Sequence, residues 1–279
     1  MYYNIKMISC ELMGGLGNQL FQIFATISYA IKYKQAFQFL KKDFLGKRAT
    51  YWNSFLLSLK EFTTLNLTKM QVIKETKFNY QELPVPNENT KLHGYFQSYK
   101  YFESSFDSIC RLIRLDNQKT TIKYKYMHNF DNLISMHFRL GDYKSLQEYH
   151  PILNFKYYKN SIKHIIDKTN NPKLKVLFFC EKEDNEDVQE IIELLQICYP
   201  DCRFIKGYDD AADWEQMLMM SICRHNIIAN STYSWWSAYF NTHEDKIVCY
   251  PDIWFGPKLI DVNNTCDLFP EKWNKISSD

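Results

Sequence analysis

Apolar and polar positions along this chain alternate between two patterns: short apolar runs, and longer stretches in which apolar residues recur every three or four positions. The first pattern is typical of buried strands and the second of amphipathic helices. The runs predict strands at residues 5–12, 36–40, 91–95, 133–138, 175–180, 202–205, 226–229 and 246–250. The periodic stretches predict helices at residues 19–33, 101–113, 155–168, 184–198, 214–223 and 235–241. Because strands that alternate with helices build parallel sheets, the expected fold class is α/β.

A polar, lysine-rich segment at residues 116–125 interrupts this alternation and is the expected domain junction. The 279 residues are enough for two medium-sized domains. We therefore predict an N-terminal domain over residues 1–125 and a C-terminal domain over residues 126–279.

The composition is that of a globular protein, with 46% hydrophobic residues, 24% charged residues and a net charge of +2. Such a charge gives no reason to expect nucleic acid or an anionic membrane surface as a partner. The eight cysteines are scattered without a CxxC pair, which argues against a zinc site and suits a reducing compartment. The apolar run 20–31 is too short to span a bilayer, and no signal-peptide pattern precedes it. The expected location is the cytoplasm, with no transmembrane segment and with peripheral membrane association left open.

The segment Ser135–Tyr143 places ionisable side chains at the end of a predicted buried strand. His137 and Arg139 alternate along that strand and therefore project to the same side. A permanently charged, planar guanidinium suits a phosphate or pyrophosphate. The alternative is a charged strand end that makes a structural salt bridge.

Two strand-to-helix turns could bind an anion. In the first, Gly14 to Gln19, backbone N–H groups and a helix dipole are joined by the amides of Asn18 and Gln19, which can bind sugar or phosphate oxygens. Its spacing is not that of the dinucleotide fingerprint, because the final glycine is replaced by Leu20. The alternative is a glycine turn that packs a helix on a sheet.

The second turn follows the predicted strand 226–229 and reads NSTYSWW. It offers one amide and three hydroxyls, those of Asn230, Ser231, Thr232 and Ser234. The alternative is an ordinary Ser/Thr helix cap with the two tryptophans in the core.

Acidic residues gather at 181–187 and 209–213. Both runs precede predicted helices, where acids favour a helix start. We interpret them as helix-start and surface charge, and predict no metal site.

Four segments occur in the order of a known family: Met13–Phe24 (MGGLGNQLFQIF), His93–Phe102 (HGYFQSYKYF), Met136–Tyr143 (MHFRLGDY) and Met219–Asn241 (MMSICRHNIIANSTYSWWSAYFN). Together they resemble the α-1,2-fucosyltransferases of glycosyltransferase family 11, over essentially the whole chain. The resemblance implies a GT-B-type architecture of two Rossmann-like halves with parallel sheets. It also implies inverting transfer from GDP-fucose, held mainly by the C-terminal half, to the 2-hydroxyl of a terminal galactoside, with no cofactor and no metal.

The resemblance also assigns roles to residues. His137 is expected at the guanosine and Arg139 at the β-phosphate. The turn after strand 226–229 is expected to line the pyrophosphate and fucose. The N-terminal half supplies the wall on the acceptor side. The expected donor-site residues are Gly15, Asn18, Gln19, His137, Arg139, Asn230, Ser231, Thr232 and Ser234.

The chemistry agrees with this assignment. GDP departs with extra negative charge on its β-phosphate, so an enzyme without metal needs a fixed cation there, and Arg139 is the candidate. Direct displacement also needs a base for the acceptor hydroxyl. Asp142 is the first candidate and Glu11 the second.

Two departures from the family pattern are present. A leucine, Leu140, stands where family members usually carry a second arginine, and Cys180-Glu181-Lys182 replaces the usual Ser-Asp-Asp.

Two alternatives to the leading hypothesis stay open. One is the same fold with another GDP-sugar or acceptor, as in an O-fucosyltransferase-like activity. The other is a catalytically silent nucleotide- or glycan-binding module.

Overall fold

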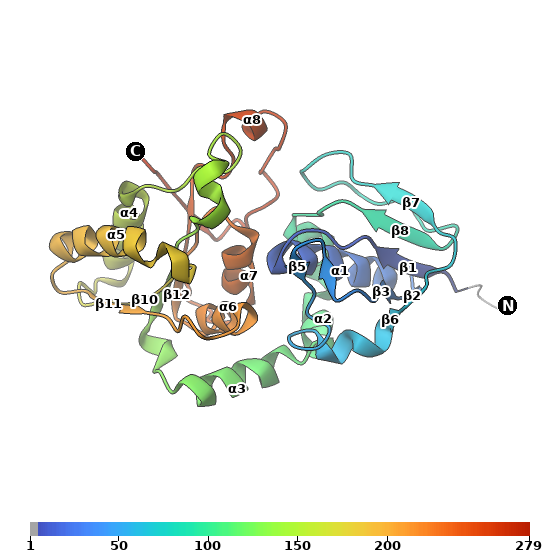
Figure 1. Cartoon of the computed structure of the whole chain (residues 1–279), viewed down its shortest axis with the longest axis horizontal. Coiled ribbons are helices and arrows are strands. Elements are labelled where there is room, and N and C mark those ends of the chain that lie inside the picture. The colour runs from blue at the N-terminus through green and yellow to red at the C-terminus, as the bar shows by residue number, and fades with distance from the viewer. Residues whose placement is uncertain (1–4) are drawn as a thin grey trace. The chain divides into compact units, whose positions relative to one another are not determined.

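The computed structural model describes residues 5–279, and the chain forms two compact α/β units (Figure 1). Unit 1 comprises the residues up to Gln118 together with Asn263–Pro270, and unit 2 comprises Lys119–Val262 with Glu271–Asp279. The boundary after Gln118 and the predicted domain boundary after residue 125 both fall within helix α3 (Leu115–Tyr126). The segment expected as a polar junction is therefore helical.

Unit 1 is built on a four-stranded parallel sheet with the order β2-β1-β8-β7. Two small pairs accompany it, a parallel one between β3 and β6 and an antiparallel one between β4 and β5. The strands are β1 (Met7–Cys10), β2 (Ala36–Phe37), β3 (Phe39–Leu40), β4 (Phe44–Leu45), β5 (Arg48–Ala49), β6 (Thr63–Thr64), β7 (Gln71–Lys74) and β8 (Thr90–His93). The helices are α1 (Leu16–Lys32) and α2 (Phe106–Leu112), with 3₁₀ turns η1 (Leu57–Phe62), η2 (Tyr99–Tyr101) and η3 (Glu103–Ser105).

Helix α1 is the core element of unit 1. All but one of its residues from Leu16 to Ala30 are buried, on every side of the helix. Phe24 meets the ring of Phe102 edge-on at 5.5 Å, and Phe21 lies 5.9 Å from the same ring. Burying a phenylalanine side chain contributes about 1.5–3 kcal/mol, so this aromatic cluster anchors the helix.

Unit 2 is built on a six-stranded parallel sheet with the order β11-β10-β9-β12-β13-β14. The strands are β9 (Ile134–His137), β10 (Lys175–Phe179), β11 (Arg203–Lys206), β12 (His225–Ile227), β13 (Val248–Pro251) and β14 (Asn274–Ile276). The helices are α4 (Phe155–Thr169), α5 (Asn185–Cys198), α6 (Asp213–Ser221), α7 (Thr232–Phe240) and α8 (Pro257–Ile260), with 3₁₀ turns η4 (Phe130–Asn132), η5 (Gly141–Ser145) and η6 (Lys182–Asp184).

Helices cover both faces of this sheet (Figure 1). On one face, Met136 and Phe178 belong to an apolar core shared with α4 and α5. On the other face, strand residue Asn226 reaches the carbonyl of Met220 in α6, and α6 packs along α7. Ser135 of β9 accepts from Asn226 Nδ2 at 2.8 Å on this second face, whereas Met136 belongs to the first. Alternate residues of β9 thus face opposite helix layers, as the two-residue period of a strand requires. The predicted α/β class is confirmed, as are the two Rossmann-like halves with parallel sheets that a GT-B-type architecture needs.

Several predicted elements differ from the structure. The predicted strand 36–40 is wrong as a single strand, because β2 joins the main sheet while β3 pairs with β6. Strand β7 was not predicted, since it is an edge strand with exposed side chains and carries no apolar alternation. Helices α1 and α7 begin three residues before their predicted starts, because Gly15 and Ser231 are their N-caps.

Within residues 5–279, no helix combines the length and the apolar character needed to cross a bilayer. Each of the eight cysteines is a free thiol, and five of them are buried.

Candidate functional site

The predicted phosphate-binding residues of unit 2 lie at the carboxyl edge of its sheet. Strand β9 is central, with β10 on one side and β12 on the other, all parallel. The loops that follow the three strands therefore emerge at the same edge, where ligands bind in open α/β sheets.

Arg139 extends from the end of β9 and is paired with two carboxylates. One terminal nitrogen donates to Glu181, in the loop after β10, and the other donates to Asp142, three residues further on. Its guanidinium carbon lies 5.1 Å from the ring centre of Tyr143. Burial acts to lower the pKa of Arg139, but the two carboxylates prevail and raise it, so the cation is permanent. The salt bridge that the sequence left open as an alternative is thus present.

His137 is buried at the last position of β9, and its Nδ1 atom has no hydrogen-bond partner among the described residues. Burial, with smaller effects from Arg139 and Lys206, lowers the pKa of His137 to about 3. The imidazole is therefore neutral. Its ring centre lies 5.3 Å from that of Tyr233. A buried polar atom without a partner is costly, so the unpaired Nδ1 at this strand end calls for an explanation.

Asn230 supplies a second buried atom of this kind. Its Nδ2 donates to the carbonyls of Pro151 (2.8 Å) and Trp254 (3.4 Å), whereas its Oδ1 has no partner among the described residues. The following residue, Ser231, caps α7 by accepting from the backbone N–H of Tyr233 at 3.3 Å. The helix-cap alternative is therefore also present, and the cap directs the first N–H groups of a nine-residue helix toward this edge.

Two further residues of the same turn differ in accessibility. Thr232 is half-buried at the first position of α7. Ser234 is fully buried, and its hydroxyl donates to the carbonyls of Ala229 (3.4 Å) and Ser231 (3.3 Å). The Ser234 hydroxyl faces its own turn, so a donor-binding role requires it to act through that turn.

Tyr143 joins the two loops and was not singled out from the sequence as a site residue. Its hydroxyl donates to the backbone carbonyl of Asn230 at 3.1 Å, while its ring lies under Arg139. The Tyr143 ring also stacks on His150, with the ring centres 5.0 Å apart and an angle of 21° between the rings. His150 also lies 5.9 Å from the ring of Phe255. The only sequence signal was position, since Tyr143 directly follows the segment Arg139-Leu140-Gly141-Asp142.

Three of the five acidic residues at 181–187, Glu181, Asp184 and Asp187, are bound to basic groups or to backbone. Asp184 is buried and accepts from the backbone N–H of Gly141 at 2.7 Å. Lys144 bridges Asp184 and Asp187 at 2.8 and 2.6 Å. These bonds tie the loop after β9 to the loop after β10.

The acids at 209–213 are similarly engaged. Asp209 pairs with Lys206 at 2.7 Å and accepts from Asn185 at 2.9 Å. Asp210 lies 4.0 Å from Lys182. In the part of the chain that the structure describes, no group of three or more His, Cys, Asp or Glu residues is arranged to hold a metal ion.

The two positions that depart from the family pattern also lie in unit 2, next to Arg139 in the sequence or in contact with it. Leu140 is buried and belongs to the apolar core of unit 2, so this position serves packing and adds no second cation. Glu181 stands at the other variant position and pairs with Arg139.

The remaining predicted residues lie in unit 1, at the start of α1. Gly14 has φ +76° and Gly15 is the extended N-cap of the helix. Asn18, in the first turn, accepts from Gln97 Nε2 at 3.1 Å. Gln19 is fully buried and donates to the carbonyls of Gly14 (3.0 Å) and Ala49 (2.9 Å), while its Oε1 has no partner among the described residues. The glycine turn therefore packs the helix, and it also holds a third unpaired polar atom.

Glu11, the second candidate base, follows β1 and is exposed. It pairs with His93 at 3.0 Å and with Lys91 at 3.6 Å. The hydrogen bond from His93 is the main cause that lowers the pKa of Glu11.

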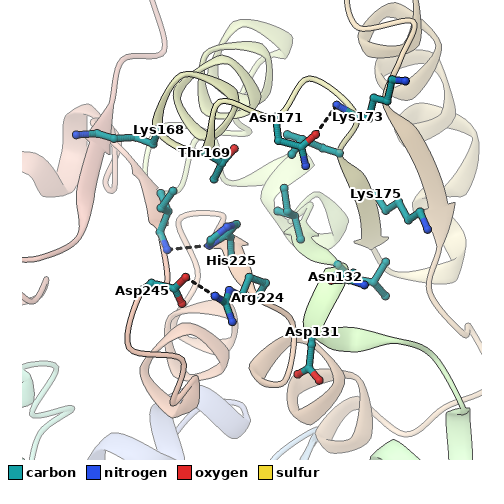
Figure 2. A pocket seen from close by; sticks show the side chains of 14 residues that line it. Asp131, Asn132, Lys168, Thr169, Asn171, Lys173, Lys175, Arg224, His225 and Asp245 are labelled. Atoms are coloured by element: carbon teal, nitrogen blue, oxygen red, sulfur yellow. Dashed lines mark hydrogen bonds and ion pairs between the residues drawn. The ribbon is translucent and has the colours of Figure 1, made fainter.

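A pocket of about 880 Å³ lies at the opposite, amino edge of the unit 2 sheet (Figure 2). It is lined by the starts of β9, β10 and β12, and His225 Nδ1 accepts from the Ile247 N–H at 3.0 Å. Arg224 is paired with Asp245. Figure 2 shows the side chains of Lys168 and Lys175 extending away from the middle of the pocket. No convergent set of charges forms there, and the predicted site residues lie elsewhere.

Comparison with known proteins identifies the family to which the chain belongs. A model described as glycosyl transferase family 11 matches residues 66–274, well over half of the chain. The O-antigen biosynthesis glycosyltransferase WbnK of Escherichia coli is 29% identical over 96% of this chain and 99% of its own length. An α-1,2-colitosyltransferase of Escherichia coli is 26% identical over 98% of this chain and 99% of its own length. Among solved structures, a variant of Arabidopsis thaliana FUT1 in complex with GDP aligns with a TM-score of 0.48 at 12% identity, covering 88% of this chain and 70% of that one.

Proposed function

The chain belongs to glycosyl transferase family 11 and is a glycosyltransferase, and from this premise we propose that it is an inverting galactoside α-1,2-fucosyltransferase using GDP-fucose. The observation that carries the proposal is the carboxyl edge of the unit 2 sheet. There a permanent cation, Arg139, extends from β9, and the neighbouring strand ends carry the two unpaired buried atoms His137 Nδ1 and Asn230 Oδ1. A cation beside unsatisfied hydrogen-bonding groups suits a ligand that is both anionic and polar, such as a nucleoside diphosphate sugar.

The donor is proposed to bind with its diphosphate at Arg139 and at the start of α7. The guanidinium supplies fixed positive charge, and the start of α7, which Ser231 caps, supplies the positive end of a helix dipole. His137 is neutral, so it interacts with the guanosine through hydrogen bonding and packing without placing a second charge on the diphosphate.

The reaction is proposed to be a single displacement. The 2-hydroxyl oxygen of the galactoside attacks the anomeric carbon of fucose as the bond from that carbon to the β-phosphate oxygen breaks. The electron pair of the broken bond stays on GDP, where Arg139 stabilises it. The hydroxyl proton passes to a carboxylate base, and the anomeric configuration inverts.

Asp142 is proposed as that base. It is exposed, lies just past the Gly141 turn, and shares the guanidinium of Arg139 with Glu181. The observed ion pair favours a competing role, in which Asp142 orients Arg139. If the donor diphosphate replaces carboxylates at Arg139, Asp142 becomes available to an acceptor hydroxyl. Gly15, Asn18 and Gln19 of unit 1 stay predicted donor-site residues.

A second candidate keeps the chemistry and changes the sugar. The relative named α-1,2-colitosyltransferase aligns over 98% of this chain, at nearly the same identity as the O-antigen glycosyltransferase. An activated colitose is therefore an alternative donor, and a glycan of O-antigen biosynthesis is an alternative acceptor.

The test is to incubate purified protein with GDP-fucose, other GDP-sugars and activated colitose, each with a panel of galactosides, and to determine the linkage of any product. Fucose on the galactose 2-hydroxyl supports the proposal. Transfer of another sugar shifts the assignment to the alternative donor. Donor hydrolysis and transfer both absent, with GDP still bound, would identify a silent binding module.

A further inference from the structure

We infer that Tyr143 is a positioning residue that couples the Arg139 loop, residues 139–146, to the Asn230 turn, residues 229–232. The inference rests on the proposed function, because both segments carry the proposed donor contacts. It assigns a role to a residue that lies between the cation and the polar turn.

Three contacts fix Tyr143 between the two segments. The hydroxyl donates to the Asn230 carbonyl at 3.1 Å, across the strand ends of β9 and β12. One ring contact is with Arg139, whose guanidinium carbon is 5.1 Å from the ring centre. The other is with His150, stacked at 5.0 Å. The ring is thus held by aromatic contact while its hydroxyl holds the next loop.

The ring and the hydroxyl of Tyr143 have different roles. The ring supports the Arg139 guanidinium, which favours the face of an aromatic ring. The hydroxyl fixes the backbone of Asn230, whose own side chain is already bound to Pro151 and Trp254 and leaves Oδ1 unpaired. Phosphate and sugar contacts made from two loops act together only if their spacing is fixed, and a displacement of about 1 Å can cost ~10²-fold in rate.

The loop that carries Arg139 is also held on the side of β10. Gly141 adopts φ +39°, and a Cβ there would lie 2.8 Å from Glu181 Oε2. Gly141 and Lys144 tie this loop toward β10 through Asp184. On the other side, the Tyr143 hydroxyl binds the Asn230 carbonyl in the loop after β12. The Arg139 loop is thus held from both neighbouring strands.

The experiment compares Tyr143→Phe, Tyr143→Leu and Tyr199→Phe with the wild-type protein. Tyr143→Phe removes the hydroxyl and keeps the ring, whereas Tyr143→Leu removes both. Tyr199→Phe is the matched control, because the Tyr199 hydroxyl also donates to a backbone carbonyl, that of Lys159 at 2.8 Å, at the far end of α5. Three quantities are measured: amide hydrogen exchange without ligand, GDP affinity by calorimetry, and kcat at saturating donor.

For Tyr143→Phe we expect faster exchange in both 139–146 and 229–232, GDP binding weaker by ~3–10-fold, and a lower kcat. For Tyr143→Leu we expect a further loss of about 10-fold in GDP affinity. Tyr199→Phe should leave all three quantities at wild-type values. A merely structural role would instead lower thermal stability and leave exchange in the 229–232 turn unchanged.

Exchange that rises in only one of the two segments, or wild-type GDP affinity in Tyr143→Leu, would overturn the inference. If the wild-type protein binds no GDP, the donor proposal fails separately. The exchange comparison still decides whether Tyr143 couples the two loops.

Discussion

At the scale of single residues, the site depends on one cation with two anionic partners. Arg139 donates to both Asp142 and Glu181, and no second arginine follows it, since Leu140 is part of the core. The sequence could predict that Arg139 lies at a strand end, because the apolar run before it is plain. It could not predict which carboxylates the guanidinium meets, because Glu181 is 42 residues away and reaches Arg139 only through the pairing of β9 with β10.

Arg139→Ala is expected to reduce turnover by ~10²-fold or more, because Leu140 leaves no adjacent arginine to stabilise the departing phosphate. Arg224→Ala is the matched control, since Arg224 also pairs with an aspartate, Asp245, but at the amino edge of the same sheet. Steady-state kinetics on both variants check this. Turnover retained by Arg139→Ala, or lost equally in Arg224→Ala, would contradict the assignment.

Asp142→Asn separates the base from the ion-pair role. If Asp142 takes the acceptor proton, kcat should fall by ~10²–10⁴-fold while GDP affinity stays near that of the wild type. Glu181→Gln removes the other carboxylate on the same guanidinium and is the control. Calorimetry with GDP and kcat at saturating donor are measured on both. If both substitutions change GDP affinity similarly and spare kcat, Asp142 only orients Arg139.

At the scale of elements, the order of strands and helices from β9 to β13 follows from the apolar pattern, because the interior strands of this sheet are largely buried. Helix α8 and strand β14 were not predicted. The starts of α1 and α7 were harder to predict. Each begins at a turn whose last residue, Gly15 or Ser231, is the N-cap, so turn residues and helix residues overlap in the sequence. Edge strand β7 escaped prediction because pairing, rather than burial, defines it.

Gly14→Ala should destabilise the fold beyond the cost of its backbone conformation. A Cβ at Gly14 would lie 2.5 Å from Asn18 Nδ2, and the residue has φ +76°. Gly46→Ala is the control, because Gly46 has φ +62° with nothing within 4 Å of the added Cβ. Each substitution carries about 1 kcal/mol of conformational cost. Urea unfolding should show a larger loss in the free energy of unfolding for Gly14→Ala than for Gly46→Ala. Equal losses would show that the close contact with Asn18 adds nothing to the cost.

The acidic segments before α5 and α6 lead to a prediction about metals. Their carboxylates are bound to Lys144, Lys206 and backbone, and the proposed chemistry places Arg139 at the phosphate. Transfer should therefore persist after dialysis against EDTA. Activity that is abolished by EDTA and restored by Mg²⁺ or Mn²⁺ would overturn the interpretation of these acids and the proposed role of Arg139 as the main source of positive charge.

At the scale of the whole molecule, the α/β class could be predicted because strand and helix periods alternate along most of the chain. The return of residues 263–270 to unit 1 could not, because the segment carries no periodic pattern. It is fixed there by single contacts, such as Ser98 Oγ donating to the Asp267 carbonyl at 2.7 Å. The sequence also could not predict the unpaired atoms of Gln19, His137 and Asn230. Whether a polar atom lacks a partner can be seen only once its surroundings in the fold are known.

Two buried histidines make the stability of unit 2 sensitive to acid. Burial is the main cause that lowers the pKa of His137 to about 3 and that of His225 to about 4. An unfolded histidine takes up its proton near pH 6.5, so the stabilisation is complete above that pH. It is lost as the pH falls from 6.5 toward the folded-state values, at ~1.4 kcal/mol per pH unit for each histidine. The urea concentration at the midpoint of unfolding should therefore decrease when the pH is lowered from 7 to 5.

His225→Asn tests this argument away from the proposed donor site. The asparagine oxygen can still accept from the Ile247 N–H, but the side chain cannot be protonated in this range. The variant is therefore expected to lose less stability between pH 7 and pH 5 than the wild type, by ~1–2 kcal/mol. If the wild type and His225→Asn show parallel pH profiles, the buried neutral His225 is not a source of the acid sensitivity.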